Sequence, residues 1–227
     1  MKKKSLTTAA LSFVTVHAFA QGQILFSASP ANGLIQFSTD GVNAIAYPAA
    51  GIPTFGVANV GFFVAPNATV LTLLPNGLPN FTINGWTAVG TVLPVGNHPS
   101  GDGTAFVNGL VLPSLPGGTT SSPVELEIVA WTGTATTWAA AVASSSTELL
   151  GFSGDTFNGA TEGHLGWSQG TSSSVPATLV VTGPGGFSGI TVKRTPEPST
   201  FVLGGLGAAM LMLFRFFKKH KMQSAVR

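Results

Sequence analysis

Few residues of this chain combine the type and the spacing that catalysis needs. The clearest pair is Glu125 and Glu127, which stand two positions apart in an apolar stretch. On a β-strand, residues so spaced share one face about 7 Å apart, which falls within the range of carboxylate separations in glycoside hydrolases. An exposed strand face produces the same pattern without catalysis, so a glycoside-active enzyme is a remote alternative.

The other catalytic and metal-binding patterns are incomplete. Residues 151–155 read Gly-Phe-Ser-Gly-Asp, which departs from the Gly-x-Ser-x-Gly sequence of a nucleophile elbow. His98 and His164 lack the histidine or cysteine partners of a transition-metal site. Asp102 and Asp155 lack the dense acidic spacing of a calcium loop. We therefore predict that the protein is not an enzyme and uses no metal or cofactor.

Binding of a neutral ligand is better supported by the aromatic residues. Trp86, Trp138 and Trp167 are candidates for stacking on sugar rings, whereas Trp131 is expected in the core. A polysaccharide-binding module should expose two or more tryptophans on one face, and a structural protein should bury nearly all of them. Both alternatives stay open at this point.

A threonine row offers a further alternative. Thr132, Thr134 and Thr136 would share one face of a strand, which suits ice binding. The row is single and unrepeated, and this Thr-rich composition produces such rows by chance. Ice binding is therefore a remote alternative.

The secondary structure that positions these residues is indicated by a series of short apolar runs along the chain. Stretches rich in proline and glycine separate the runs, which is typical of an all-β domain. We predict a single β-sandwich-like domain whose strands lie in the runs at residues 24–26, 34–37, 57–64, 70–74, 86–93, 105–112, 124–131, 177–181 and 189–192.

The clearest strand signal is the alternation at residues 124–128. Val124, Leu126 and Ile128 are expected to face the core, and Glu125 and Glu127 to face water. The Ala-rich stretch at 137–143 is the one candidate for a short helix, and an exposed β-strand edge is the competing interpretation.

The N-terminus has the pattern of a cleavable signal peptide. Lys2, Lys3 and Lys4 precede a short apolar stretch, and Ala18 and Ala20 form an A-x-A cleavage site before Gln21. Residues 1–20 are therefore predicted to direct Sec export and to be removed. Residues 21–192 form the exterior domain.

The C-terminus, residues 193–227, has three successive features. Two prolines hold Glu197 in an extended Thr195–Thr200 segment. Residues 201–217 are apolar except for Arg215, and about 17 residues of helix span roughly 26 Å, just enough for a thin membrane. The basic cluster at 218–221 follows and belongs on the cytoplasmic side. The topology-setting cations are Arg215, Lys218, Lys219 and Lys221.

This order of features resembles the PEP-CTERM sorting tail of bacteria that make extracellular polysaccharide. The matching motif is Pro196-Glu197-Pro198 with Ser199, and the resemblance covers residues 195–221. It implies that a membrane-embedded exosortase recognises the tail, cuts near the motif and releases or transfers the protein outward. Residues 21–192 resemble the β-rich domains that precede such tails, and that resemblance implies no activity. A plain tail anchor with a proline-rich linker is the alternative.

The distribution of charge excludes nucleic acid as a partner. All ten lysines and arginines lie at positions 2–4, 193–194 or 215–227, whereas seven of the eight acidic residues lie between 21 and 192. The exterior domain thus carries about seven negative charges, and phosphate backbones need a basic face. The chain has no cysteine, so its stability depends on packing and backbone pairing.

The sequence therefore predicts an exported surface or extracellular-matrix protein. It should be anchored by its C-terminal helix first, and lie at the cell surface or outside after processing. Its expected partners are the Sec machinery, an exosortase and the membrane. Binding of exopolysaccharide is the first alternative function.

Overall fold

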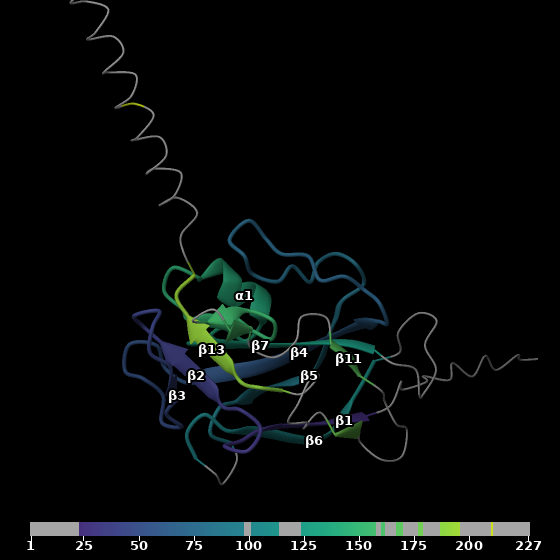
Figure 1. Cartoon of the computed structure of the whole chain (residues 1–227), viewed down its shortest axis with the longest axis horizontal. Helices are drawn as coiled ribbons and strands as arrows, with labels where there is room; N and C mark the ends of the chain where they lie inside the picture. Colours follow the sequence, from purple (N-terminus) through teal and green to yellow (C-terminus); the bar gives the residue numbers. More distant parts are fainter. Residues whose placement is uncertain are drawn as a thin grey trace, which may run out of the picture.

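The computed structural model describes residues 23–97, 101–113, 124–157, 160–161, 167–169, 177–178, 187–195 and Met210. Strands dominate this part of the chain (Figure 1). Its one complete helix, α1 (Trp138–Ala143), has six residues. The prediction of a β-rich domain with little helix is confirmed.

Eight strands form a large sheet. Seven follow the spatial order β3-β2-β13-β8-β7-β4-β5, and β11 also pairs with β7. Their bounds are β2 (Ile35–Ser38), β3 (Ile45–Ala46), β4 (Ala58–Pro66), β5 (Thr87–Pro94), β7 (Val124–Thr132), β8 (Leu150–Phe152), β11 (Trp167–Gln169) and β13 (Ile190–Lys193).

A smaller sheet covers one face of the large sheet. It has the order β12-β1-β6, with bounds β1 (Gln23–Ala28), β6 (Ala105–Val111) and β12 (Ala177–Thr178). A separate hairpin joins β9 (Thr156–Phe157) to β10 (Ala160–Thr161). Figure 1 shows β1 and β6 on one side of β4 and β5, and α1 on the other side.

The main core lies between the two sheets. Phe26 of β1 makes edge-to-face contacts with Phe62 of β4 and with Phe187, at centroid distances of 5.0 and 5.1 Å. All three rings are buried, together with alternate residues of β4 and β7. Edge-to-face aromatic pairs add to the stabilisation from burial itself.

Strand β7 is covered on both of its faces. Val124, Leu126 and Ile128 point into the core between the sheets, as predicted. The prediction that Glu125 and Glu127 face water is wrong, because they are 5% and 0% exposed. The alternation identified the two faces correctly, but other parts of the chain cover the second face.

Residues 67–86 form one part of that cover. The run at 70–74 was predicted to be a strand, but it lies in an irregular segment that makes only an isolated bridge from Leu73 to Pro79. Leu71 and Trp86 pack on Ala65, and Leu78 packs with Val129 and Trp131 on the outer face of the large sheet.

Helix α1 forms the other part of the cover. The predicted helix at 137–143 is confirmed, and the strand-edge alternative is excluded. Thr137 is the N-cap, because its hydroxyl accepts a hydrogen bond from Ala140 N at 3.2 Å. Trp138 and Ala141 are buried against the sheet.

Strand β13 is the last strand that the structure describes. Its last residue, Lys193, pairs with Ser38 of β2 and Leu150 of β8, and its Nζ lies 3.0 Å from Asp155 Oδ2. The Arg194 guanidinium lies 5.9 Å from the ring centroid of Phe55. Val192, the predicted last residue of the exterior domain, is therefore followed by one more residue of β13 and by the contact of Arg194 with Phe55.

The predicted terminal signals lie outside the described residues. These are residues 1–20 with Ala18 and Ala20, the motif Pro196-Glu197-Pro198-Ser199, and the basic residues Arg215, Lys218, Lys219 and Lys221. Of the predicted helix at 201–217, only Met210 is described; it is helical and exposed. Within the described ranges, no helix is long and apolar enough to cross a membrane.

Candidate functional site

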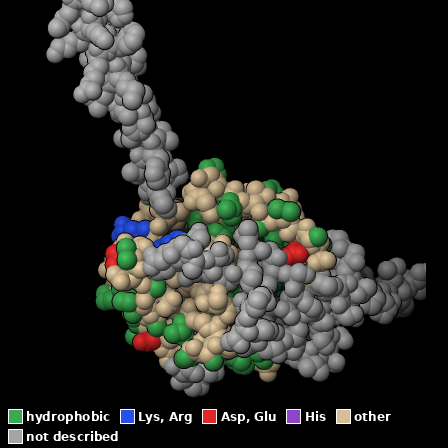
Figure 2. Space-filling view, viewed as in Figure 1, with side chains coloured by type: hydrophobic (Ala, Val, Ile, Leu, Met, Phe, Trp, Pro, Cys, Tyr) green, Lys and Arg blue, Asp and Glu red, His purple; other side chains and the backbone are tan. Residues whose placement is uncertain are grey.

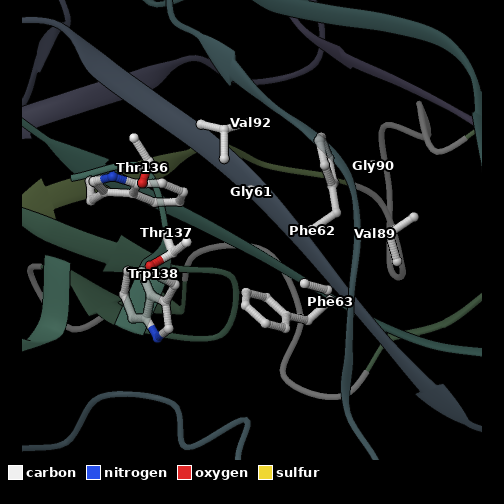
Figure 3. Close-up of a pocket in the computed structure, with 11 residues that line it drawn as sticks. Gly61, Phe62, Phe63, Val89, Gly90, Val92, Thr136, Thr137 and Trp138 are labelled. Carbon is white, nitrogen blue, oxygen red and sulfur yellow. The ribbon is translucent and has the colours of Figure 1, made fainter. Parts of the chain in front are cut away.

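A groove lies on the outer face of the large sheet, beside α1 (Figure 3). Its deeper part has a volume of about 160 Å³ between β4, β5 and residues 136–138. A shallower hollow of about 540 Å³ continues over Asn59 and residues 133–135 and shares Gly90, Val92 and Thr136 with the deeper part.

Trp131 and Gly61 shape the floor of the groove. A Cβ atom at Gly61 would lie 2.9 Å from Cζ3 of Trp131, so the glycine lets the indole lie across β4. Trp131 Nε1 donates to Ala135 O at 2.7 Å, which ties the loop after β7 to the floor. Asn59 Nδ2 donates to Gly133 O at 3.3 Å and holds the same loop from β4.

Aromatic rings form the wall of the groove. Phe63 stacks on Phe81 at a centroid distance of 3.7 Å, with an angle of 7° between the rings. Trp138 meets Trp131 edge to face at 6.2 Å, and its Nε1 donates to Pro79 O at 3.3 Å. Both indole N–H groups therefore donate to backbone carbonyls. The rings can offer a ligand only apolar surface.

The polar groups of the groove are neutral. Thr136 and Thr137 are exposed at its edge, although the Thr137 hydroxyl also caps α1. None of the described lining residues is charged. Apolar walls with a few hydroxyl groups suit a small neutral ligand that has one apolar face.

The tryptophans proposed for glycan stacking are largely enclosed. Trp86 and Trp138 are 7% and 4% exposed, so the prediction that they present open faces is wrong. Trp131 is 1% exposed, which confirms its expected place in a core. Strand β11 places the backbone of Trp167 opposite Leu126. The side chain of Trp167 is outside the described part of the structure.

The threonine row predicted for ice binding does not form. Strand β7 ends at Thr132, which is buried and donates to Glu148 Oε2 at 2.8 Å. Thr134 and Thr136 are exposed but lie in the following loop. A flat, regular row needs one continuous strand, and this chain turns away after its first member.

The two glutamates of β7 make internal hydrogen bonds. Glu125 Oε1 accepts from Ala68 N at 2.6 Å, and this bond fastens the segment that follows β4. Glu127 Oε1 accepts from the Ser153 hydroxyl. Glu125 therefore holds part of the cover of the outer face in place, Glu127 binds the residue after β8, and the exposed acid pair expected for a glycosidase is absent.

Ser153 belongs to the same internal network. Its hydroxyl accepts from Ile128 N at 3.0 Å, and its own N–H donates to Ile128 O at 2.8 Å. The side chain is wholly buried, so this serine links β8 to β7 away from solvent. In the described part of the chain, no three His, Cys, Asp or Glu side chains gather as metal ligands would. His98 and His164 lie outside that part.

The shifted pKa values of Asp40 and Tyr47 also have structural causes. The amides of Asn43 and Val42 donate to the Asp40 carboxylate and hold its pKa well below the usual range. Burial raises the pKa of Tyr47 to about 12. The Tyr47 hydroxyl donates to Gly56 O at 2.6 Å, and neither residue lines the groove.

In comparisons with known proteins, no family model, curated protein or solved structure matches this chain.

Proposed function

We propose that this is an exported surface or matrix protein of the PEP-CTERM type, recognised by an exosortase through Pro196-Glu197-Pro198. The observation that carries the proposal is the order of that motif, an apolar segment at 201–217 and a basic cluster at 218–221. A simple spacer needs only polar residues. A protease gains from an extended segment that presents one charged group at a defined place.

The position of β13 supports this proposal. The strand ends at Lys193, Arg194 contacts Phe55, and the Thr195 hydroxyl is still buried, so the motif begins directly after the last described residue that packs on the domain. A cut near the motif would leave the strand and its partners intact. The finer architecture that we propose is a β-sandwich of the two sheets, preceded by a signal peptide and followed by a membrane helix.

The proposed role is structural rather than catalytic. Export through the Sec machinery, anchoring by the C-terminal helix and processing by the exosortase would leave an acidic domain at the cell surface or in the matrix. Glu125, Glu127 and Ser153 make hydrogen bonds within the domain. These bonds favour a structural role over a glycoside-active enzyme.

The test is Glu197→Gln, which removes the charge but keeps the size and the two prolines. In the native host, the wild-type protein should lie outside the cell without tail peptides. The variant should accumulate in the membrane fraction with residues 201–227 attached. Mass spectrometry of both fractions checks this result, with Glu162→Gln as the matched control. Processing of Glu197→Gln at the normal rate would leave the plain tail anchor as the better account.

Binding of exopolysaccharide is the second candidate function, and the groove favours it. Its apolar wall suits the C–H face of one sugar ring, and Thr136 offers a hydroxyl at its edge. Because the deeper part measures only about 160 Å³, we expect it to hold one ring or a chain end rather than a long segment.

Filling the groove tests this second candidate. Thr136→Trp places a large ring over the opening from an exposed position and should abolish any glycan-array signal of the domain 21–195. Thr54→Trp is the control, because Thr54 is also exposed and does not line the groove. A wild-type domain that binds no glycan, or equal binding by both variants, removes the groove as a glycan site.

A further inference from the structure

We propose that one rim of the large sheet rests against the outer surface of the membrane while the tail is uncut. The β13 rim is the edge at which β2, β13 and β7 end and β8 and β4 begin. This inference rests on the proposed function, since it takes residues 201–217 as the membrane anchor. The partner of the β13 rim is the lipid headgroup layer.

The strand register brings distant residues together at this rim. Lys193 pairs with Ser38 on one side and with Leu150 on the other. Leu150 pairs with Trp131, and Trp131 pairs with Asn59, so five strands reach the rim at one level. The same edge of the sheet therefore carries the turn after β2, Arg194 after β13, and Val57 before β4.

The length of the connecting chain limits how far the rim can move from the membrane. Five residues, 196–200, separate Thr195 from Phe201. A fully extended chain rises about 3.3–3.6 Å per residue, so the six steps from Thr195 to Phe201 span at most about 22 Å. Pro196 and Pro198 stiffen this connector. Because β13 lies inside the sheet rather than at its edge, the rim on both sides of it is held near the membrane.

The surface of the rim suits a headgroup layer. Val42, Ile45 and Val57 are 62%, 59% and 42% exposed. Val42 lies in the turn after β2, and Ile45 pairs with Phe37, which pairs with Val192. Apolar side chains at the level of the headgroups gain free energy by leaving water.

The charges of the rim fit the same partner. Lys193 and Arg194 are the only lysines and arginines between residues 4 and 215. Lys193 is paired with Asp155, whereas Arg194 is exposed and can direct its guanidinium to lipid phosphate. Figure 2 shows basic, acidic and hydrophobic side chains together at this side of the domain. Since Asp40 lies in the same turn as Val42, we expect the rim to favour zwitterionic over strongly anionic lipid.

Single-cysteine labelling tests the proposal without a background substitution, because the chain has no cysteine. A fluorophore is attached to Ile45→Cys in the full chain, in phosphatidylcholine–phosphatidylethanolamine vesicles with a headgroup-attached spin-label quencher. The matched control is Val70→Cys, an apolar position that is 73% exposed. It follows β4, which leads about 30 Å away from the rim.

The expected result is several-fold stronger quenching at position 45 than at position 70. Insertion of a flexible Gly/Ser linker of about 20 residues, with a root-mean-square span of about 25 Å, between Thr195 and Pro196 should remove the difference. Equal quenching at the two positions overturns the proposal, and a difference that survives the linker overturns the short connector as its cause. A chain that does not float with the vesicles overturns the membrane anchor as well, so the two failures are distinguishable.

Discussion

A chain that ends at residue 186 is expected not to fold, whereas a chain that ends at Thr195 should keep the native fold. Strand β13 provides the link between β2 and β8 in the large sheet. Its loss would leave β2 and β3 without their connection to the rest of that sheet.

The burial of three side chains between residues 187 and 192 leads to the same expectation. Phe187, Ile190 and Val192 are 2%, 0% and 0% exposed. Burial of such side chains contributes about 1.5–3 kcal/mol each, or about 5–9 kcal/mol together. That loss is comparable with the whole stability of a typical domain, about 5–15 kcal/mol.

Circular dichroism and thermal melting of residues 21–195 and 21–186 measure the effect. The shorter chain should lack a cooperative transition, and the longer chain should melt like the exterior part of the uncut protein. If the shorter chain melts within a few degrees of the longer one, β13 is not essential to the fold. A cooperative melt of the longer chain alone would also agree with a processing cut beyond Arg194.

Leu126→Asp is the substitution with the second-largest expected effect. Leu126 is wholly buried between the two sheets, and β7 pairs at this point with Val64 of β4 and with Trp167 of β11. An unpaired carboxylate in an apolar interior costs several kcal/mol. In a domain of this size each kcal/mol lowers Tm by about 2–4 °C, so the variant should melt more than about 10 °C lower or be insoluble.

Val70→Asp is the matched control for Leu126→Asp. It makes the same type of change, from aliphatic to acidic, at a side chain that is 73% exposed. Its effect on Tm should be small, because the new carboxylate stays in water. Equal effects of the two substitutions on Tm would mean that the faces of β7 are assigned wrongly.

Local sequence patterns determined the longer strands, whereas β3, β8, β9, β10 and β11 are not among the predicted runs. The alternation at 124–128 indicates which residues of β7 point into the main core, since side chains of a strand alternate between its faces. The alanine-rich stretch at 137–143 indicates α1 as one of two interpretations, because helix propensity acts within a few residues. The predicted sorting signals at both ends depend likewise on neighbouring residues.

Only the tertiary structure decided what covers each face. The glutamates of β7 look solvated in the sequence, but the segment after β4 and Ser153 enclose them. The run at 70–74 has the apolar residues of a strand, yet it serves as part of that cover. Trp86 and Trp138 are buried by the same packing, and the groove exists because Gly61 lets Trp131 lie across β4. Burial depends on contacts between residues far apart in the chain, and a local pattern carries no information about which segment will supply them.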